Sequence, residues 1–188
     1  MTANGSDRRI LLARHGETND NLRPLRFQGF TDTPLNQHGR RQAEQLAERV
    51  VSEGIASLWS SDLARARETA QLVARRLGLQ TRLDPRLREG YRGRWEGRLF
   101  VDVASEEPAR YSAWQRAGEG FRFPGGESLR DQQDRVSVAI DEIRAGGELP
   151  ALVVCHGGSI RVMLSARHPR GLGAFHEFEV PNVGVLAL

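Results

Sequence analysis

The sequence predicts an α/β fold, a three-layer α/β/α sandwich built around a mostly parallel central sheet. Strand-like apolar runs alternate along the chain with amphipathic helical patterns, and this order is typical of parallel sheets with helices on both faces. The run at 151–155 is apolar throughout, as expected of a strand that is buried on both faces. Polar residues also follow three of the strands directly, at the edge where α/β sheets bind ligands.

The first half of the chain contains three predicted strands and two predicted helices. The strands lie at about 9–14, 55–59 and 80–83. The first helix begins after Asn36, a favourable N-cap, and ends at Gly54. The second helix is predicted to be capped by Asp62 and to end at Gly78. Its apolar face consists of Ala66, Ala70, Val73 and Leu77.

The second half begins with a loop-rich segment at 84–126, which carries many aromatic and basic side chains. This composition predicts a lid over the end of the sheet rather than another layer. A helix is expected from about Ser128 to Arg144, a strand at 151–155, and a further helix from about Ser159. Residues 174–188 are expected to form one or two edge strands. Since there is no linker or repeat, we expect a single domain over 1–188 with a lid-like insertion near 97–126.

Composition excludes several classes of function. All 27 basic residues are arginines, which excludes a lysine Schiff base and a P-loop lysine. Cys155 is the only cysteine and the five histidines lack metal-ligand spacing, so we expect no metal site. Basic and acidic residues alternate along the predicted helices, which indicates solvated faces rather than a surface for nucleic acid. With no secretory signal and no membrane-spanning run, a cytoplasmic protein without membrane attachment is expected.

Polar residues that suit an anion follow three of the predicted strands. They are Arg14-His15-Gly16, the segment 60–65 that ends with Arg65, and His156-Gly157-Gly158. The planar guanidinium of arginine matches phosphate oxygens, and the N-termini of the following helices add backbone N–H donors. If the three strands are neighbours, these residues converge on a site for a phosphate dianion.

A histidine in such a site is suited to attack phosphorus. Burial and neighbouring arginines lower the pKa of an imidazole, so one histidine would be neutral at pH 7. Its attack would form a covalent phosphohistidine and divide a slow hydrolysis into two easier steps. Glu89 is the candidate proton donor to the leaving oxygen, provided that bound phosphate raises its pKa. The alternative for Glu89 is a surface carboxylate that pairs with Arg88 or Arg92.

The same residues resemble the histidine phosphatase superfamily, also called phosphoglycerate mutase-like, over nearly the whole chain. The matching segments are Arg-His-Gly-Glu-Thr at 14–18, Phe-Gln-Gly at 27–29, Asp-Thr-Pro-Leu at 32–35, Ser-Ser-Asp-Leu at 60–63, Leu-Arg-Glu at 87–89, Trp-Glu-Gly at 95–97, Pro-Gly-Gly-Glu-Ser at 124–128 and His-Gly-Gly at 156–158. The sequence departs from the family pattern at several places. Asp20 stands where a large apolar residue is usual, the stretch from Asn21 to Phe27 is one residue longer, and Arg92 stands where an aromatic residue is common.

The resemblance implies roles for individual residues. His15 would be the phosphorylated nucleophile and Glu89 the proton donor. The phosphate pocket would consist of Arg14, Arg65 and His156. Further contacts with phosphate or substrate are expected from Asn21, Gln28, Gly29 and Gly157. The resemblance implies no metal or other cofactor, and the expected partner is a small phosphorylated metabolite.

Three alternatives remain open at this point. Within the family, a mutase passes the phosphoryl group to a substrate hydroxyl and a phosphatase passes it to water. The short segment at 97–126 favours hydrolysis. Cys155, Gly158 and Arg161 also fit the C-x-x-G-x-x-R loop of cysteine-dependent phosphatases, although Cys155 equally suits a buried core position. A domain that binds phosphate without chemistry is the third alternative, yet His15, Arg65 and Glu89 are all present. The sequence does not indicate an oligomeric state.

Overall fold

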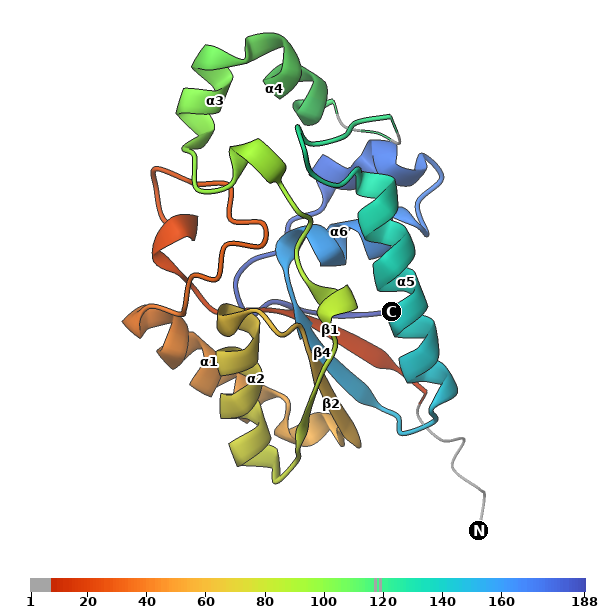
Figure 1. Ribbon diagram of the computed structural model, residues 1–188. Coiled ribbons are helices and arrows are strands. Elements are labelled where there is room, and N and C mark those ends of the chain that lie inside the picture. Colours follow the sequence, from red (N-terminus) through yellow and green to blue (C-terminus); the bar gives the residue numbers. More distant parts are fainter. Residues whose placement is uncertain (1–7, 117, 119) are drawn as a thin grey trace.

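The computed structural model describes residues 8–116, 118 and 120–188, and a five-stranded sheet lies at its centre (Figure 1). The strands are β1 (Ile10–Arg14), β2 (Ser57–Ser60), β3 (Thr81–Leu83), β4 (Ala151–Cys155) and β5 (Val185–Ala187). Their order is β3-β2-β4-β1-β5, and only β5 is antiparallel to its neighbour. The mostly parallel sheet is confirmed, with one edge strand near the end of the chain.

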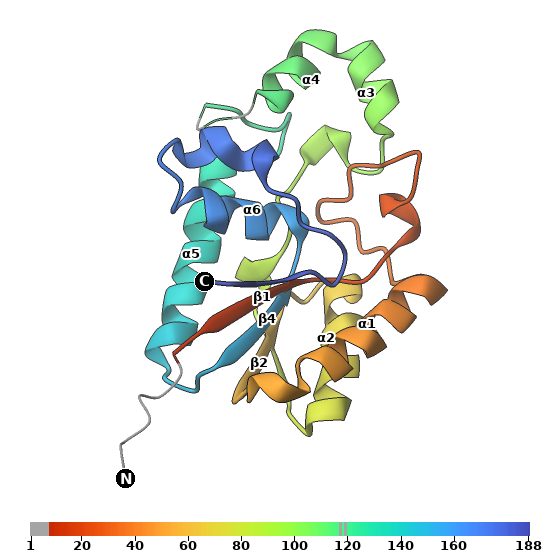
Figure 2. The same cartoon turned by 180° about the vertical axis from the view of Figure 1, so that it is seen from behind.

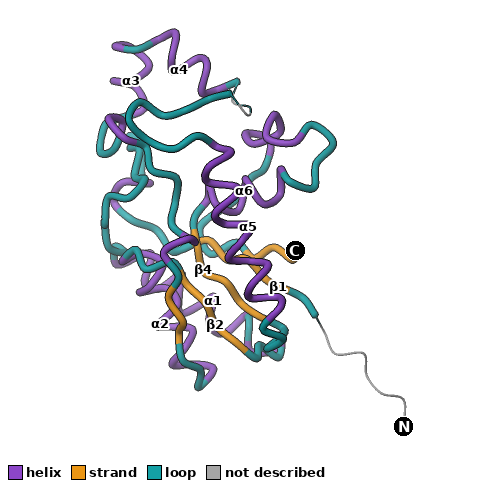
Figure 3. Tube along the Cα trace, turned by 45° about the vertical axis from the view of Figure 1, so that its right-hand side comes forward, coloured by secondary structure: helices purple, strands orange, loops and turns teal. Residues whose placement is uncertain are grey.

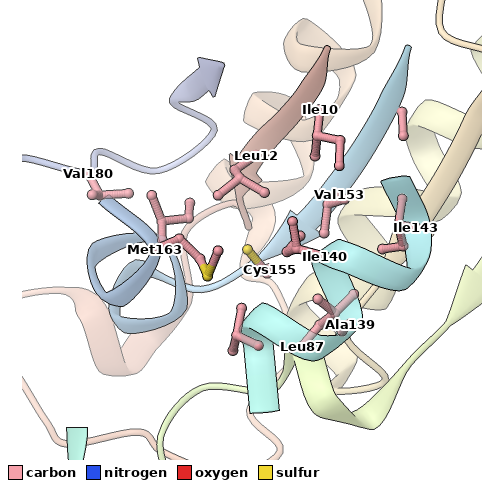
Figure 4. Close-up of a cluster of buried hydrophobic side chains, with 13 residues drawn as sticks. Ile10, Leu12, Leu87, Ala139, Ile140, Ile143, Val153, Cys155, Met163 and Val180 are labelled. Carbon is pink, nitrogen blue, oxygen red and sulfur yellow. The ribbon is translucent and has the colours of Figure 1, made fainter. Parts of the chain in front are cut away.

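Helices cover both faces of the sheet (Figures 1 and 2), which confirms the three-layer sandwich. Helices α1 (Gln37–Arg49) and α2 (Ala64–Leu77) lie on one face, where Leu46 and Val73 pack against Leu152. Helices α5 (Leu129–Ala145) and α6 (Gly157–Ser165) lie on the other. There Ile140 packs with Val153 in the cluster drawn in Figure 4. Adjacent strand residues alternate between the two clusters, as the pleat of a strand requires.

The caps of the first two helices agree with the sequence in part. Asn36 Oδ1 accepts a hydrogen bond from Gly39 N at 2.8 Å, so the predicted N-cap of α1 is confirmed. The prediction that Asp62 caps α2 is wrong. The N-cap is Leu63, because the carboxylate of Asp62 instead accepts from Arg88 Nε at 2.7 Å. The left-handed Gly78 ends α2 as predicted, with φ at 68°.

The segment at 84–126 contains two helices that the sequence did not predict, α3 (Phe100–Glu106) and α4 (Pro108–Gln115). With 7 and 8 residues, each makes about two turns, too few for an apolar period to be recognised. The two helices lie beyond the sheet (Figure 3). The aromatic side chains of this segment form a third buried cluster. We call α3, α4 and this cluster the cap; its main members are Phe27, Trp95, Phe100, Trp114, Phe123 and Phe175.

The register of the sheet aligns the ends of three strands. Arg14 pairs with Cys155, and Ser60 pairs with Val154. The chain therefore leaves β1, β4 and β2 at the same edge. Helix α6 begins at Gly157, two residues before the predicted Ser159, because His156 serves as its N-cap residue. Over residues 8–116, 118 and 120–188, no helix combines the length and apolar character needed to cross a membrane.

Candidate active site

His15 is the first residue beyond β1, and its side chain is buried. Its Nδ1 lies 2.7 Å from the carbonyl oxygen of Gly16. Since a carbonyl oxygen only accepts, Nδ1 carries the ring proton and Nε2 keeps a free electron pair. Asn182 Nδ2 donates to the carbonyl oxygen of His15 at 2.9 Å. The imidazole is thus held with its unprotonated nitrogen available as a nucleophile.

The turn after His15 is closely packed against α1 and α2. A Cβ at Gly16 would lie 2.4 Å from the carbonyl oxygen of Gly39 in the first turn of α1. Gly16 N donates to Thr69 Oγ1 of α2 at 3.1 Å. Only a residue without a side chain fits here, so the glycine places His15 between the two helices and the sheet.

His156 lies beside His15 at the end of β4. The two ring centroids are 5.2 Å apart, and His156 Nε2 lies 2.9 Å from Ser61 Oγ. Burial lowers the pKa of both histidines well below 6.5, and the charge of Arg65 lowers both further. Both imidazoles are therefore neutral at pH 7.

Two arginines bring positive charge to this pair. Arg65 of α2 is fully buried, and its Nη1 and Nη2 donate to the carbonyl oxygens of Thr31 and Gly29, each at 2.8 Å. Arg14 Nη1 donates to the carbonyl oxygen of Val180 at 2.7 Å. Burial lowers the pKa of Arg65 to about 10, so it remains a cation at neutral pH.

Several buried nitrogen atoms of the site lack an acceptor within the part of the chain that the structure describes. They are Arg14 Nε, Asn21 Nδ2, Arg65 Nε, Arg92 Nη1 and His156 Nδ1. Buried polar groups in proteins are nearly always paired. Arginine Nε and amide Nδ2 only donate, and His156 Nδ1 donates in the tautomer whose Nε2 accepts from Ser61. These atoms therefore suit an acceptor such as a phosphoryl oxygen.

Glu89 reaches the site from the segment after β3. Its Oε1 accepts from Gly90 N at 2.8 Å, Arg92 Nη2 at 3.0 Å and Gln132 Nε2 at 2.9 Å. Its Oε2 accepts from Gly158 N at 2.9 Å. Burial raises the pKa of Glu89, but the charge of Arg92 and these donors outweigh burial and lower it to about 2.

The structure corrects the interpretation of Glu89 as a surface carboxylate, whereas its role as proton donor stays a prediction. The carboxylate does pair with Arg92, yet the Glu89 side chain is only 14% exposed and does not lie on the surface. Arg88 pairs with Asp62 instead. A pKa of about 2 also means that Glu89 is ionised, without a proton to give, before a substrate arrives.

A cavity of about 420 Å³ opens beside these residues. Arg14 and Glu89 line it, as do all four residues predicted to contact substrate, namely Asn21, Gln28, Gly29 and Gly157. Phe100 and Trp114 of the cap form part of its wall. His15, Arg65 and His156 are not among the residues that line it. A larger hollow, of about 960 Å³, lies in the cap around Arg110 and Phe121 and contains no predicted site residue.

The predicted substrate contacts have different structural roles. Asn21 Oδ1 accepts from Thr18 N at 3.0 Å, and Gln28 Nε2 donates to Thr18 Oγ1, so both amides are fixed to the loop after β1. The carbonyl oxygen of Gly29 anchors Arg65. A Cβ at Gly157 would lie 3.5 Å from Arg14 Nε, an ordinary contact.

Sequence reasoning missed Gln132, which is fully buried on α5 and donates both to Glu89 and to Ser159 Oγ, the latter at 3.2 Å. One feature of the sequence could have identified it: Gln132 is a polar residue four positions before Val136, on the apolar face of a predicted helix. The role of Asn182 in fixing the His15 backbone was missed as well, because nothing in the local pattern connects residues so far apart in sequence.

Cys155 is a core residue. Its side chain is 1% exposed and packs with Leu12, Ile140 and Met163 (Figure 4). Burial raises the pKa of its thiol to about 12, so it is not a thiolate at neutral pH, as a cysteine nucleophile must be. Among the described residues, no three His, Cys, Asp or Glu side chains are grouped to hold a metal ion.

Comparison with known proteins agrees with this geometry. The sequence profile of the histidine phosphatase superfamily (branch 1) matches residues 10–188. A Yersinia pestis (strain Pestoides F) protein named probable phosphoglycerate mutase GpmB is 39% identical over 160 residues, which cover 83% of this chain and 73% of the relative.

Two similar solved structures carry phosphatase names. A mycobacterial glucosyl-3-phosphoglycerate phosphatase, in complex with VO3, has a TM-score of 0.88 and 31% sequence identity. The match covers 96% of this chain and 92% of the phosphatase chain. A putative alpha-ribazole-5'-P phosphatase from Escherichia coli K-12 has a TM-score of 0.84 and 28% sequence identity. The match covers 97% of this chain and 90% of that phosphatase. With its whole sheet and the segments around the site matched, this chain belongs to branch 1 of the histidine phosphatase superfamily.

Proposed function

We propose that this protein is a metal-independent phosphatase that hydrolyses small phosphate monoesters through a phosphohistidine on His15. The observation that carries the proposal is a group of buried N–H donors that have no acceptor among the described residues, together with a neutral imidazole whose Nε2 is unprotonated. These donors suit a phosphoryl group, and the imidazole beside them suits attack on its phosphorus.

In the first step, His15 Nε2 attacks phosphorus and the bond to the ester oxygen breaks. Arg14, Arg65 and His156 are the groups that would donate to the non-bridging phosphoryl oxygens. These side chains need little reorganisation when the phosphoryl group binds, because hydrogen bonds to the protein already fix them. Glu89 would pass a proton to the leaving oxygen. The hydrogen bond from Nδ1 to Gly16 stabilises the positive ring that forms.

In the second step, water attacks the phosphohistidine and the P–N bond breaks. Glu89 is ionised and lines the cavity, so it suits the removal of a proton from that water. The products are inorganic phosphate and the neutral imidazole. Glu89 then gives the proton it took from water to the departing phosphate, which closes the cycle without a metal ion.

Hydrolysis and mutase transfer share the first step and differ in the acceptor. The short segment at 97–126 and the phosphatase names of two similar structures support water. The mutase name of a relative supports a hydroxyl group. Incubation with 3-phosphoglycerate and a trace of the 2,3-bisphosphate separates them. We expect release of free phosphate; rapid formation of 2-phosphoglycerate without free phosphate would show a mutase.

The cavity favours a substrate with a second negative charge. Arg26, Arg92 and Arg161 line it, against the single acidic residue Glu89 among its described lining residues. Arg161 is held by one hydrogen bond, from its Nε to the carbonyl oxygen of Phe178 at 3.0 Å. A screen of small phosphate esters, followed by phosphate release, tests this preference. Anionic esters such as phosphorylated acids should have a lower KM than neutral sugar phosphates of the same size.

A further inference from the structure

Arg92 forms a buried ion pair with Glu89. Its Nη2 lies 3.0 Å from Glu89 Oε1, and the two side chains are only 10% and 14% exposed. The contact is therefore shielded from water, where a charge pair acts more strongly than at the surface. Arg92 is also the position at which the sequence departs from the aromatic residue common in its family.

The Arg92 side chain is fixed by its surroundings. Its guanidinium carbon lies 4.4 Å from the centroid of the Phe123 ring in the cap. Its backbone N donates to Glu96 Oε1 at 3.1 Å. A Cβ at Gly158 would lie 2.8 Å from Nη2, and one at Gly90 would lie 2.8 Å from Nη1. The guanidinium thus fills space that two glycines leave open.

The bonds to Glu89 distinguish its two oxygens. Oε1 accepts three hydrogen bonds, including the one from Arg92, and has no room for a proton. Oε2 accepts only from Gly158 N and keeps a free electron pair. Oε2 is therefore the oxygen suited to take up and release a proton.

Charges around Glu89 on every side favour the carboxylate. Besides Arg92, the cations that interact with it are Arg14 of β1, Arg65 of α2 and Arg161 of α6, and His15 and His156 are neutral. Arg135 of α5 donates to its backbone carbonyl oxygen at 2.8 Å. The acids in this region, Glu96 and Glu127, bond to the backbone of Arg92 and to the side chain of Arg135.

We propose that Arg92 is a positioning residue that keeps Glu89 ionised in the free enzyme, so that the proton needed by the leaving group enters the site on the substrate's own phosphate. The enzyme would then act on the monoanion of the ester. This inference rests on the phosphatase function proposed above.

The proton balance of the step is complete. The ester monoanion gives its phosphate proton to Glu89 Oε2, and Oε2 passes it to the ester oxygen as the P–O bond breaks and the N–P bond forms. The alcohol leaves neutral, Glu89 ends as a carboxylate, and the phosphohistidine keeps a net single negative charge. The total charge is the same before and after.

The wild-type protein provides the first test, the pH dependence of kcat/KM for glycerol 2-phosphate between pH 5 and 8. We expect kcat/KM to fall about tenfold per pH unit above the second pKa of the ester, which is about 6. A kcat/KM that rises through this pH and falls only at higher pH would place the proton on Glu89 and overturn the proposal.

Substitution of Arg92 provides the second test. Arg92→Met removes the charge and keeps an apolar chain over Phe123, so the pKa of Glu89 should rise and proton transfer to a poor leaving group should improve relative to a good one. We expect the ratio of kcat/KM for glycerol 2-phosphate to that for 4-nitrophenyl phosphate, whose phenolate leaves without a proton, to increase up to about tenfold per unit of pKa rise.

Two controls separate this role from a structural one. Arg92→Lys keeps the charge and should give the wild-type ratio. Arg82→Met removes an exposed arginine that pairs with Glu148 and does not line the cavity, so it should leave the ratio unchanged. If Arg92→Met lowers both kcat/KM values equally, Arg92 is only structural. If Arg92→Met does not fold, the proposal is tested by the pH dependence of kcat/KM of the wild type and by the ratio of the two kcat/KM values in Arg92→Lys. Absence of phosphate release from either ester would instead contradict the phosphatase function itself.

Discussion

The tautomer of His15 determines which of its nitrogens can attack. The carbonyl oxygen of Gly16 accepts from Nδ1 at 2.7 Å, and this short contact leaves Nε2 unprotonated. Burial and two arginines lower the pKa of the ring, so the nucleophile needs no general base at neutral pH. In many catalytic histidines a carboxylate accepts a hydrogen bond from the ring N–H and fixes the tautomer; at His15 a backbone carbonyl oxygen has this role.

Cys155 provides a prediction at the residue scale. Cys155→Ser should leave kcat/KM within about twofold, because the thiol lies in the core and not in the cavity. The buried hydroxyl should lower the free energy of unfolding by about 1–3 kcal/mol, since it is more polar than the thiol and is packed among apolar side chains. Urea unfolding and steady-state kinetics measure the two effects. A loss of turnover beyond about a hundredfold in a folded variant would support the cysteine mechanism.

Arg65 carries a second residue-scale prediction. Arg65→Lys keeps the charge but cannot bond two carbonyl oxygens and a phosphoryl oxygen at once, because lysine lacks the planar fork. We expect kcat/KM to fall by about a hundredfold or more, which corresponds to about 3 kcal/mol of lost transition-state binding. Full activity of this variant would show that Arg65 does not hold the phosphoryl group.

At the scale of elements, the start of α6 joins the sheet to Glu89. The helix begins directly after His156, and its second residue, Gly158, donates to Glu89 Oε2 at 2.9 Å. A Cβ at Gly158 would lie 2.1 Å from Glu89 Oε1. The absence of a side chain at this position therefore lets the helix N-terminus approach the carboxylate.

Gly158→Ala should consequently displace Glu89 and lower kcat for alkyl phosphates by about a hundredfold. Gly173→Ala is the matched control, since a Cβ there would be 3.9 Å from its nearest neighbour and should leave kcat unchanged. Kinetics and circular dichroism of both variants check the prediction. Equal activity of the two would mean that the position of Glu89 does not limit turnover.

The elements also show what a sequence can predict. Asn36 and Gly78 act through their own neighbouring backbone, so the start of α1 and the end of α2 were accessible to local reasoning. The first helix ends at Arg49, before the predicted Gly54. Asp62 is different, because Arg88 lies 26 positions further along the chain and removes it from its predicted role as a cap. Helices α3 and α4 were missed because aromatic packing within the cap stabilises them, rather than a periodic pattern.

At the scale of the whole molecule, the buried histidines link stability to pH. The folded pKa of His15 and His156 lies well below 6.5, so the unfolded chain takes up protons first as the pH falls. The free energy of unfolding should therefore drop as the pH falls below 6.5, by about 2 kcal/mol between pH 7 and 5.5 for the two groups. The pKa of His176 is lowered as well, and it contributes in the same direction.

Urea unfolding at pH 7, 6.5 and 5.5 measures this slope. The variant His15→Asn removes one titrating group and should reduce the slope by about half. Stability that is constant or increases over this range would show that the imidazoles are charged in the folded protein, which would contradict the proposed nucleophile.

The part of the site that lies at the ends of the parallel strands was predictable from the sequence. Parallel strands end at one edge of a sheet, so the sequence alone predicts that Arg14, His15 and His156 lie together. The state of Glu89 could not be predicted, since its pKa depends on donors from three separate segments, Arg92, Gln132 and Gly158. Such a balance between burial and charge requires the three-dimensional arrangement.

The most direct test of the central claim is the detection of phosphate on His15. The protein is mixed with an aryl phosphate, quenched rapidly and digested, and the site and acid stability of bound phosphate are determined by mass spectrometry. We predict acid-labile phosphate on His15 in the wild type and none in His15→Ala, which should also be inactive. Turnover without phosphate on His15, or phosphate bound to Cys155, would contradict this mechanism.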